Sequence, residues 1–232
     1  MQAKEQQYRI LFIGNSYTYY NHMPEEIFAA TARAAGFENV EVSSITKGGY
    51  YLGAHADAAD EIGAQVDQAL RENVYDYVVL QEQSVCPASD PERFFDNARA
   101  IVRKVRANGA KPVFYCTWGR REGNDVLAQH GWTNESMTRR LAQAYTRIGD
   151  ELDAQVAYAG PAFYEIHSKF ASRIELYAPD GSHPSPAGSY LAALTIFAKI
   201  FRADPVCIGY NGPLPAEDAL LLKQAAKAAA EM

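Results

Sequence analysis

Three residues near the two ends of the chain have the types and positions needed for nucleophilic chemistry. Ser16 follows an apolar run that ends at Gly14, and a glycine there permits a tight turn that exposes the next side chains. His183 lies three residues after Asp180, so a short turn lets the carboxylate accept the Nδ1 proton and leaves Nε2 facing a nucleophile. A serine, a base and a group that orients the base form a reactive unit. Ser16, His183 and Asp180 are therefore candidate catalytic residues.

Donors for an oxyanion hole follow other apolar runs. The backbone amides of Ser16 and of Gly49 or Gly48 can serve, because glycine lets the backbone approach a ligand closely. Gln83 adds a side-chain NH2 group just after the third apolar run. Taken singly, Ser16 and Asp180 could be ordinary turn residues and Gln83 a solvated loop amide. Their conjunction favours acyl transfer.

The elements that position these residues alternate between strand and helix patterns. Apolar, β-branched runs predict buried strands at 8–13, 40–46, 75–80, 112–117 and 155–159. Amphipathic patterns with helix start and stop signals predict helices at 24–35, 58–72, 91–107 and 135–152, and around 161–172, 186–201 and 215–230. This alternation predicts a parallel five-stranded sheet covered on both faces, which is a three-layer α/β/α sandwich. No linker-like stretch divides the chain, so we expect a single domain over residues 1–232.

Sites in such sheets lie beyond the carboxyl ends of the strands, where the candidate residues stand. Aromatic and polar groups at the same edge could contact a substrate, as a platform for a sugar ring with an arginine bound to a carboxylate. The plainer interpretation is that the aromatic rings are half-buried packing and the arginine belongs to a solvated rim. The candidate substrate contacts are Asn15, Tyr17, Tyr50, Trp118 and Arg120.

Composition excludes several classes of protein. The net charge is −6 and the isoelectric point is near 5.4, which argues against a broad nucleic-acid or anionic-membrane surface. No apolar segment is long enough to predict a membrane span. No P-loop pattern is present, and the glycine pair at 48–49 is not a dinucleotide fingerprint. The opening residues show no secretory segment, so the sequence as written predicts a cytoplasmic protein, or a periplasmic or secreted one if a leader was removed.

The motifs together resemble those of the SGNH (GDSL-like) hydrolase superfamily. The resemblance runs from ILFIGNS at 10–16 to DGSHPSPAG at 180–188 and includes the glycine pair at 48–49. Asn15 stands where the family more often has aspartate. The third block departs further: the family usually has Gly-x-Asn-Asp, whereas residues 81–84 of this chain read QEQS. Gln83 then takes the position of the oxyanion-hole asparagine.

The resemblance implies a flavodoxin-like fold and an esterase without cofactor or metal, often one that removes O-acetyl groups from carbohydrates. We therefore expect hydrolysis of a short ester on a polar carrier, through a Ser16–His183–Asp180 triad, an acyl-enzyme and oxyanion donors from Ser16, Gly49 and Gln83. One alternative is a carbohydrate-binding protein that kept the fold but lost activity, which the unusual third block favours. Another is a metal-dependent hydrolase using Asp180, His183 and either His130 or His55, although the spacing of metal-binding motifs is missing.

Overall fold

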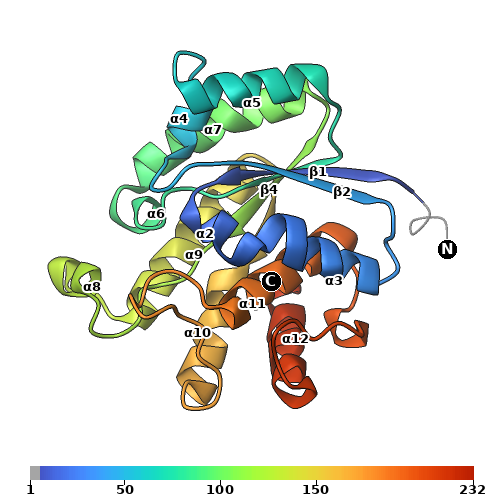
Figure 1. Ribbon diagram of the computed structural model, residues 1–232. Helices are drawn as coiled ribbons and strands as arrows, with labels where there is room; N and C mark the ends of the chain where they lie inside the picture. Colours follow the sequence, from blue (N-terminus) through green and yellow to red (C-terminus); the bar gives the residue numbers. More distant parts are fainter. Residues whose placement is uncertain (1–5) are drawn as a thin grey trace.

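The computed structural model describes residues 6–232 and contains a five-stranded sheet with every strand parallel (Figure 1). The strands are β1 (Tyr8–Gly14), β2 (Val40–Thr46), β3 (Tyr77–Leu80), β4 (Lys111–Cys116) and β5 (Gln155–Tyr158). Their order across the sheet is β2-β1-β3-β4-β5, which is the flavodoxin-like order. The predicted α/β fold class is therefore confirmed.

Helices cover both faces of the sheet (Figure 1). One face carries α5 (Glu61–Glu72), α7 (Pro91–Ala107) and α9 (Asn134–Glu151), and the other carries α3 (Ala29–Ala34), α10 (Ala159–Phe170), α11 (Pro186–Phe201) and α12 (Ala216–Ala230). The first layer meets the sheet through aromatic rings: Phe94 of α7 packs on Tyr145 of α9 and on Phe114 of β4. This packing explains why the central strands are apolar on both faces.

The structure differs from the predicted elements mainly where helices are short. Residues 24–35 were expected to form one helix, but they divide between a π-helix, η2 (Met23–Phe28), and α3. Helices of about one turn cannot show apolar periodicity, and the sequence analysis missed them. They are α2 (Ser16–Tyr19), α4 (Leu52–Ala56), α6 (Cys86–Ser89), α8 (Asp125–His130) and the 3₁₀ turns η1 (Tyr20–His22) and η3 (Pro205–Cys207).

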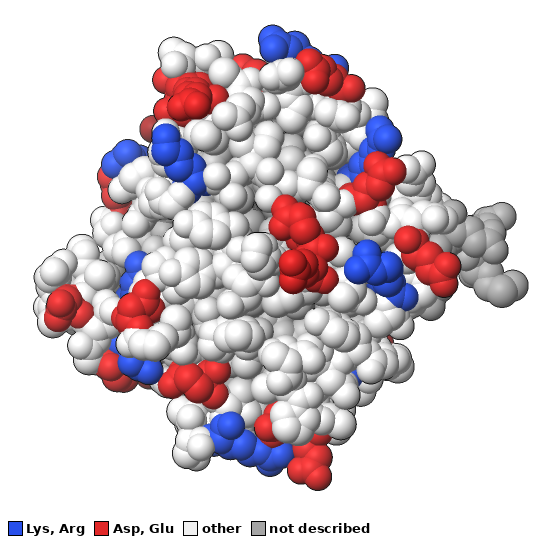
Figure 2. All heavy atoms as spheres, in the orientation of Figure 1, with Lys and Arg blue, Asp and Glu red and all other residues white. Residues whose placement is uncertain are grey.

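The surface carries mixed charge. On the face shown in Figure 2, acidic and basic side chains are interspersed, and no continuous basic field forms. Within residues 6–232, no helix has the length and apolar character needed to cross a bilayer. Residues 1–5, part of the segment on which the expected compartment depends, lie outside the described residues.

Candidate active site

Ser16 begins α2 directly after β1, at the point where the strand order reverses between β1 and β3. Gln81 is the first residue after β3. Its Oε1 accepts hydrogen bonds from the backbone amide of Asn15 (2.9 Å) and from the hydroxyl of Thr18 (3.0 Å). A Cβ atom on residue 14 would collide with the side chains of Gln81 and Thr18, so only Gly14 permits this close approach. The turn that carries Ser16 is therefore held by the neighbouring strand.

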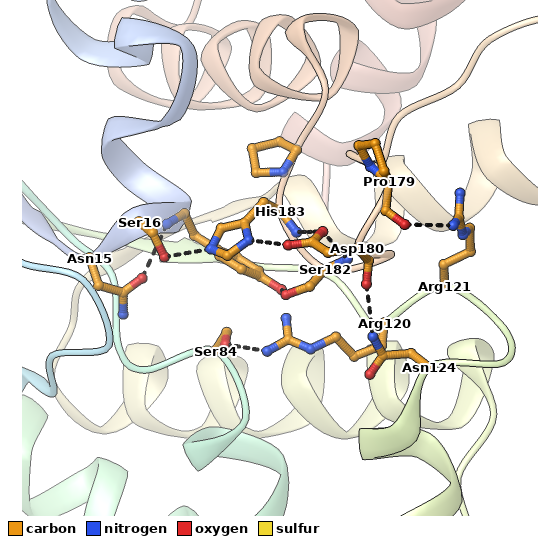
Figure 3. Close-up of polar contacts among 12 residues, drawn as sticks. Asn15, Ser16, Ser84, Arg120, Arg121, Asn124, Pro179, Asp180, Ser182 and His183 are labelled. Carbon is orange, nitrogen blue, oxygen red and sulfur yellow. Dashed lines mark hydrogen bonds and ion pairs between the residues drawn. The ribbon is translucent and has the colours of Figure 1, made fainter.

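The three predicted catalytic residues form one hydrogen-bonded chain (Figure 3). His183 Nε2 lies 2.8 Å from Ser16 Oγ, and His183 Nδ1 lies 2.5 Å from Asp180 Oδ2. Asp180 Oδ1 also accepts the backbone amides of Ser182 (2.9 Å) and His183 (3.0 Å). These contacts shape residues 178–185, which we call the histidine loop. Folding thus brings together residues that are 167 positions apart.

The environment of Asp180 favours its ionised form. Its side chain is 47% exposed. Partial burial raises the pKa of Asp180. The hydrogen bonds from His183 and from two backbone amides lower it by a larger amount, so the pKa lies below its usual value. An ionised carboxylate accepts the proton on Nδ1, which leaves the Nε2 lone pair of His183 to accept the Ser16 hydroxyl proton. The arrangement can therefore move a proton from Ser16 to His183.

The segment after Ser16 also contacts the histidine loop. The Tyr20 ring stacks on the imidazole of His183, with ring centroids 4.2 Å apart and planes 11° from parallel. Asn21 Nδ2 donates to the Pro184 carbonyl oxygen at 3.1 Å. Asn21 has a left-handed backbone with φ of 56°, which asparagine tolerates better than most residues. The nucleophile and its base are thus connected by more than their own hydrogen bond.

Two rings of the predicted aromatic platform, those of Tyr17 and Trp118, are buried. Trp118 is 0% exposed and lies between Tyr17 and Phe163, with ring centroids 4.8 and 3.8 Å away. Its Nε1 donates to the Ser182 carbonyl oxygen at 3.1 Å, and the Tyr17 hydroxyl lies 3.1 Å from Ser182 Oγ. The two rings therefore support the histidine loop from inside instead of facing a sugar.

Asn15 also proves to be buried. Its Nδ2 donates to the Tyr50 carbonyl oxygen (3.0 Å) and its Oδ1 accepts the Tyr17 amide (3.2 Å). The prediction that Asn15 contacts substrate is corrected, because its polar atoms are engaged within the protein. Its contact with Tyr50 joins the Ser16 turn to residues 47–50, the glycine turn.

The glycine turn carries the predicted backbone donors. The Tyr50 amide donates to the Lys47 carbonyl oxygen at 3.2 Å, and Gly49 has φ of 74°, a value that favours glycine. The half-buried side chain of Tyr50 accepts a hydrogen bond from Lys47 Nζ (2.9 Å) and donates one to Asp60 Oδ2 (3.1 Å). These contacts hold the Tyr50 ring within its own loop.

Gln83 lies at the start of the loop after β3, with its side chain fixed at one end. Its Oε1 accepts the backbone amides of Val85 (2.9 Å) and Cys86 (3.0 Å) at the start of α6. The carbonyl end of the side chain is thereby occupied, and the NH2 group is directed away from these two amides. Among residues 6–232, no hydrogen-bond partner engages this NH2 group, which leaves it able to act as an oxyanion-hole donor.

Glu82 is a buried residue to which the sequence analysis assigned no role. It accepts hydrogen bonds from the Gln83 amide (2.6 Å), the Leu52 amide (3.1 Å) and Asn97 Nδ2 (2.8 Å). Burial raises its pKa above the usual value, although these hydrogen bonds oppose the increase. Glu82 thus ties the loop after β3 to α4 and α7. The available signal was a carboxylate two residues after an apolar strand.

Arg120 follows β4 and lies beneath the triad (Figure 3). It is 7% exposed, and its Nη2 donates to Ser84 Oγ at 2.9 Å. Because Ser84 follows β3, this bond joins the loops of two neighbouring strands. Arg120 is thus a predicted substrate contact that places a charged group close to the triad.

The two histidines considered as third ligands of a metal site, His55 and His130, lie in α4 and α8. His55 is buried in α4 with Nδ1 3.0 Å from the Tyr51 carbonyl oxygen, and His130 in α8 stacks on Trp132. Residues 6–232 contain no group of three or more His, Cys, Asp or Glu side chains placed to hold a metal ion. The structure therefore does not assemble the metal-ligand set of that alternative.

Comparison with known proteins identifies the family. No protein-family model matches the chain, and no curated protein matches it. Among solved structures, a proposed SGNH hydrolase from Slackia heliotrinireducens is 35% identical, with a TM-score of 0.72 over 83% of this chain and 98% of that one. The chain belongs to the SGNH hydrolases.

More distant structures share the fold. A DUF4886 family protein from Bacteroides uniformis has a TM-score of 0.75 at 16% identity, over 97% of this chain and 95% of that one. The acetyl xylan esterase AlAXEase has a TM-score of 0.62 at 15% identity, over 83% and 99% of the two chains. These proteins share the fold of this chain although their sequences are only distantly similar to it.

Proposed function

We propose that this SGNH hydrolase is a serine esterase that cleaves short-chain esters through an acyl-enzyme. The observation that carries the proposal is the hydrogen-bonded chain from Asp180 through His183 to Ser16. Its distances are short enough for proton transfer during attack. The family relationship supports the same class of reaction.

The reaction proceeds in two halves. Ser16 Oγ attacks the ester carbonyl carbon while its proton moves to His183 Nε2, and the ionised Asp180 stabilises the resulting imidazolium. The tetrahedral intermediate collapses, the bond to the leaving oxygen breaks, and His183 returns the proton to the departing alcohol. Water then attacks the acyl group on Ser16, with His183 again taking the proton. Collapse of the second intermediate releases the carboxylic acid and restores Ser16.

The negative oxygen of each intermediate is held by the amides of Ser16 and Gly49 and by the side-chain NH2 of Gln83. Asn15 supports this assignment, because it connects the Ser16 turn to the glycine turn. The fixed Oε1 of Gln83 supports it too, since a preorganised donor stabilises charge without reorganising during the reaction.

The substrate in this proposal is an O-acetyl group on a carbohydrate or another polar carrier. A hollow of about 260 Å³ lies beside Asp180, and its lining includes Arg121, Glu122 and Asn124. Neither Ser16 nor His183 lines this hollow, so it supports a polar carrier only through the polar surroundings of the histidine loop. An acetyl xylan esterase shares the fold, which is compatible with this choice.

The proposal is tested with p-nitrophenyl acetate and a fluorophosphonate. We expect wild-type protein to hydrolyse the ester in the presence of a chelator, and Ser16→Ala to lose about 10,000-fold in kcat. Mass spectrometry should locate the phosphonyl adduct on Ser16, and the control Ser89→Ala, which changes an exposed serine of α6, should be labelled like wild type.

Retained hydrolysis by Ser16→Ala would reject the serine mechanism, and loss of activity with chelator would favour a metal. Binding of an acetylated glycan without turnover of any ester would favour the carbohydrate-binding alternative.

A further inference from the structure

Arg120 carries a buried charge with too few partners. Its side chain is 93% withdrawn from solvent, given its 7% exposure. Nη2 donates to Ser84 Oγ, but Nη1 is buried and has no hydrogen-bond partner among residues 6–232. The ion pairs formed by the described residues do not include Arg120. Its formal charge is thus uncompensated by any direct contact with a carboxylate.

The guanidinium of Arg120 lies close to Tyr17 and Ser84, which are next to proposed site residues in the sequence. Its Cζ is 5.1 Å from the ring centroid of Tyr17, the neighbour of Ser16. Its bonded partner Ser84 follows Gln83 in the chain. Figure 3 shows the guanidinium between Ser84 and the histidine loop, with the nitrogen that is not bonded to Ser84 directed toward that loop. The unpaired charge therefore lies beneath the residues proposed to react, with Nη1 itself buried.

Burial makes this arrangement costly. Burial lowers the pKa of Arg120 to about 10, although the negative charge of Asp180 opposes the decrease, so the side chain is still cationic at neutral pH. Buried charges in proteins are normally paired, because desolvation is otherwise uncompensated. The adjacent Arg121 shows the usual solution, since its Nη1 pairs with Glu175 at 3.2 Å. Arg120 lacks such a partner within the chain, and an anionic ligand would supply one.

We propose that Arg120 recognises a carboxylate on the ester that Ser16 attacks. The proposal rests on the esterase function above and narrows its substrate class from a polar carrier to an acidic one, such as an acetylated hydroxy acid or sugar acid. Guanidinium and carboxylate form strong charge-assisted hydrogen bonds with defined geometry. The unpartnered Nη1 supplies a donor, and the hydroxyl of Ser84 stands beside the same charge.

The test uses matched pairs of esters, with one anionic and one neutral member in each pair. O-acetyl-lactate and O-acetyl-lactamide place the charge difference on the alcohol side, and p-nitrophenyl hemisuccinate and p-nitrophenyl butyrate place it on the acyl side. The measured quantity is the ratio of kcat/KM for the anionic ester to that for its neutral partner. The proteins are wild type, Arg120→Met, Arg120→Lys and the control Arg99→Met, which removes a charge in α7 that Glu151 and Asp96 already neutralise.

We expect wild type to prefer the anionic member of one pair by about 10-fold or more. Arg120→Met should reduce that ratio to near one, Arg120→Lys should retain part of it, and Arg99→Met should leave it unchanged. The pair that shows the preference identifies the side of the ester that carries the charge. A wild-type ratio of one or less in both pairs, or an unchanged ratio in Arg120→Met with a native melting curve, would overturn the proposal.

Calorimetric titration with lactate and lactamide, neither of which is an ester, separates this inference from the esterase function. Selective binding of lactate by wild type, lost in Arg120→Met and retained in Arg99→Met, supports the carboxylate site even if Ser16→Ala shows that the serine mechanism is wrong. Equal binding of both compounds, or binding of neither, counts against it. If Arg120→Met does not fold, the decrease in both the kinetic ratio and lactate affinity in Arg120→Lys decides the matter.

Discussion

Two carboxylates organise opposite sides of the site, and their surroundings differ. Asp180 accepts two backbone amides and the Nδ1 proton of His183 while it is nearly half exposed. Glu82 also accepts two backbone amides, with Asn97 as its third donor, and is fully buried. At Asp180 the hydrogen bonds have a larger effect than burial, and the pKa is lowered. At Glu82 burial has the larger effect, and the pKa is raised.

The difference shows that the number of hydrogen bonds does not by itself decide the state of an acid. Solvent access lets Asp180 remain charged, as the proposed mechanism requires for stabilising the imidazolium of His183. Enclosure gives Glu82 a structural task, which is to fix the loop that carries Gln83. The predictions below test whether Asp180 takes part in the reaction and whether Glu82 stabilises the structure around the site.

The largest effect should follow substitution of the exposed acid. Asp180→Asn preserves the shape of the side chain but removes the charge that orients His183, and we expect kcat to fall by about 1,000- to 10,000-fold. Steady-state kinetics on p-nitrophenyl acetate measures the loss. A decrease smaller than about 10-fold would remove Asp180 from the proposed triad.

The next effect concerns the donor that Glu82 supports. Gln83→Glu keeps an oxygen to accept the Val85 and Cys86 amides but lacks the NH2 group, so we expect about a 100-fold lower kcat with a near-native melting temperature. Gln83→Leu removes both functions and should also melt earlier. Wild-type kcat in Gln83→Glu would leave only the two backbone donors in the oxyanion hole.

Glu82→Gln should affect stability in a pH-dependent way and lower kcat by about 10-fold through misplacement of Gln83. A raised pKa in the folded state contributes stability that is present below the unfolded pKa and lost as pH rises through the folded pKa. The free energy of unfolding of wild type relative to Glu82→Gln should therefore decrease as pH rises through this interval.

Urea unfolding at several pH values measures this trend. Glu38→Gln, which changes an exposed glutamate, serves as control and should run parallel to wild type. A flat difference between wild type and Glu82→Gln would mean that the pKa of Glu82 is not raised by folding.

The smallest effect should come from the ring stacked on His183. Tyr20→Leu keeps the imidazole face covered but removes the attraction of an aromatic ring for the imidazolium, and we expect kcat to fall about 3-fold with KM nearly unchanged. Tyr20→Phe should restore the rate. The control Tyr19→Leu changes a neighbouring ring that is 39% exposed and should match wild type; an equal loss there would assign the effect to the loop as a whole.

The sheet could be predicted from the sequence because its central strands contain apolar runs with clear ends. The Ser16 turn and the spacing of Asp180 and His183 were visible for a related reason, since each is set by local geometry after a strand or within one turn. Their contact across the fold was inferred from the common edge of a parallel sheet.

The errors arose where burial depends on distant partners. Trp118 stands in a loop with polar and glycine residues, so its sequence context suggested exposure, but Tyr17 and Phe163 enclose it. Glu82 would ordinarily be solvated, and only Leu52 and Asn97, from separate elements, make its burial tolerable. No local pattern contains such information.

The separation of 167 positions between Ser16 and His183 has a consequence for biosynthesis. The nucleophile emerges from the ribosome early, but its base follows only after all five strands have been made. A nascent or truncated chain that stops before the histidine loop therefore lacks the base for proton transfer. Recovery of turnover after dilution from denaturant would report closure of this long-range contact, which gives a convenient kinetic signal for completed folding.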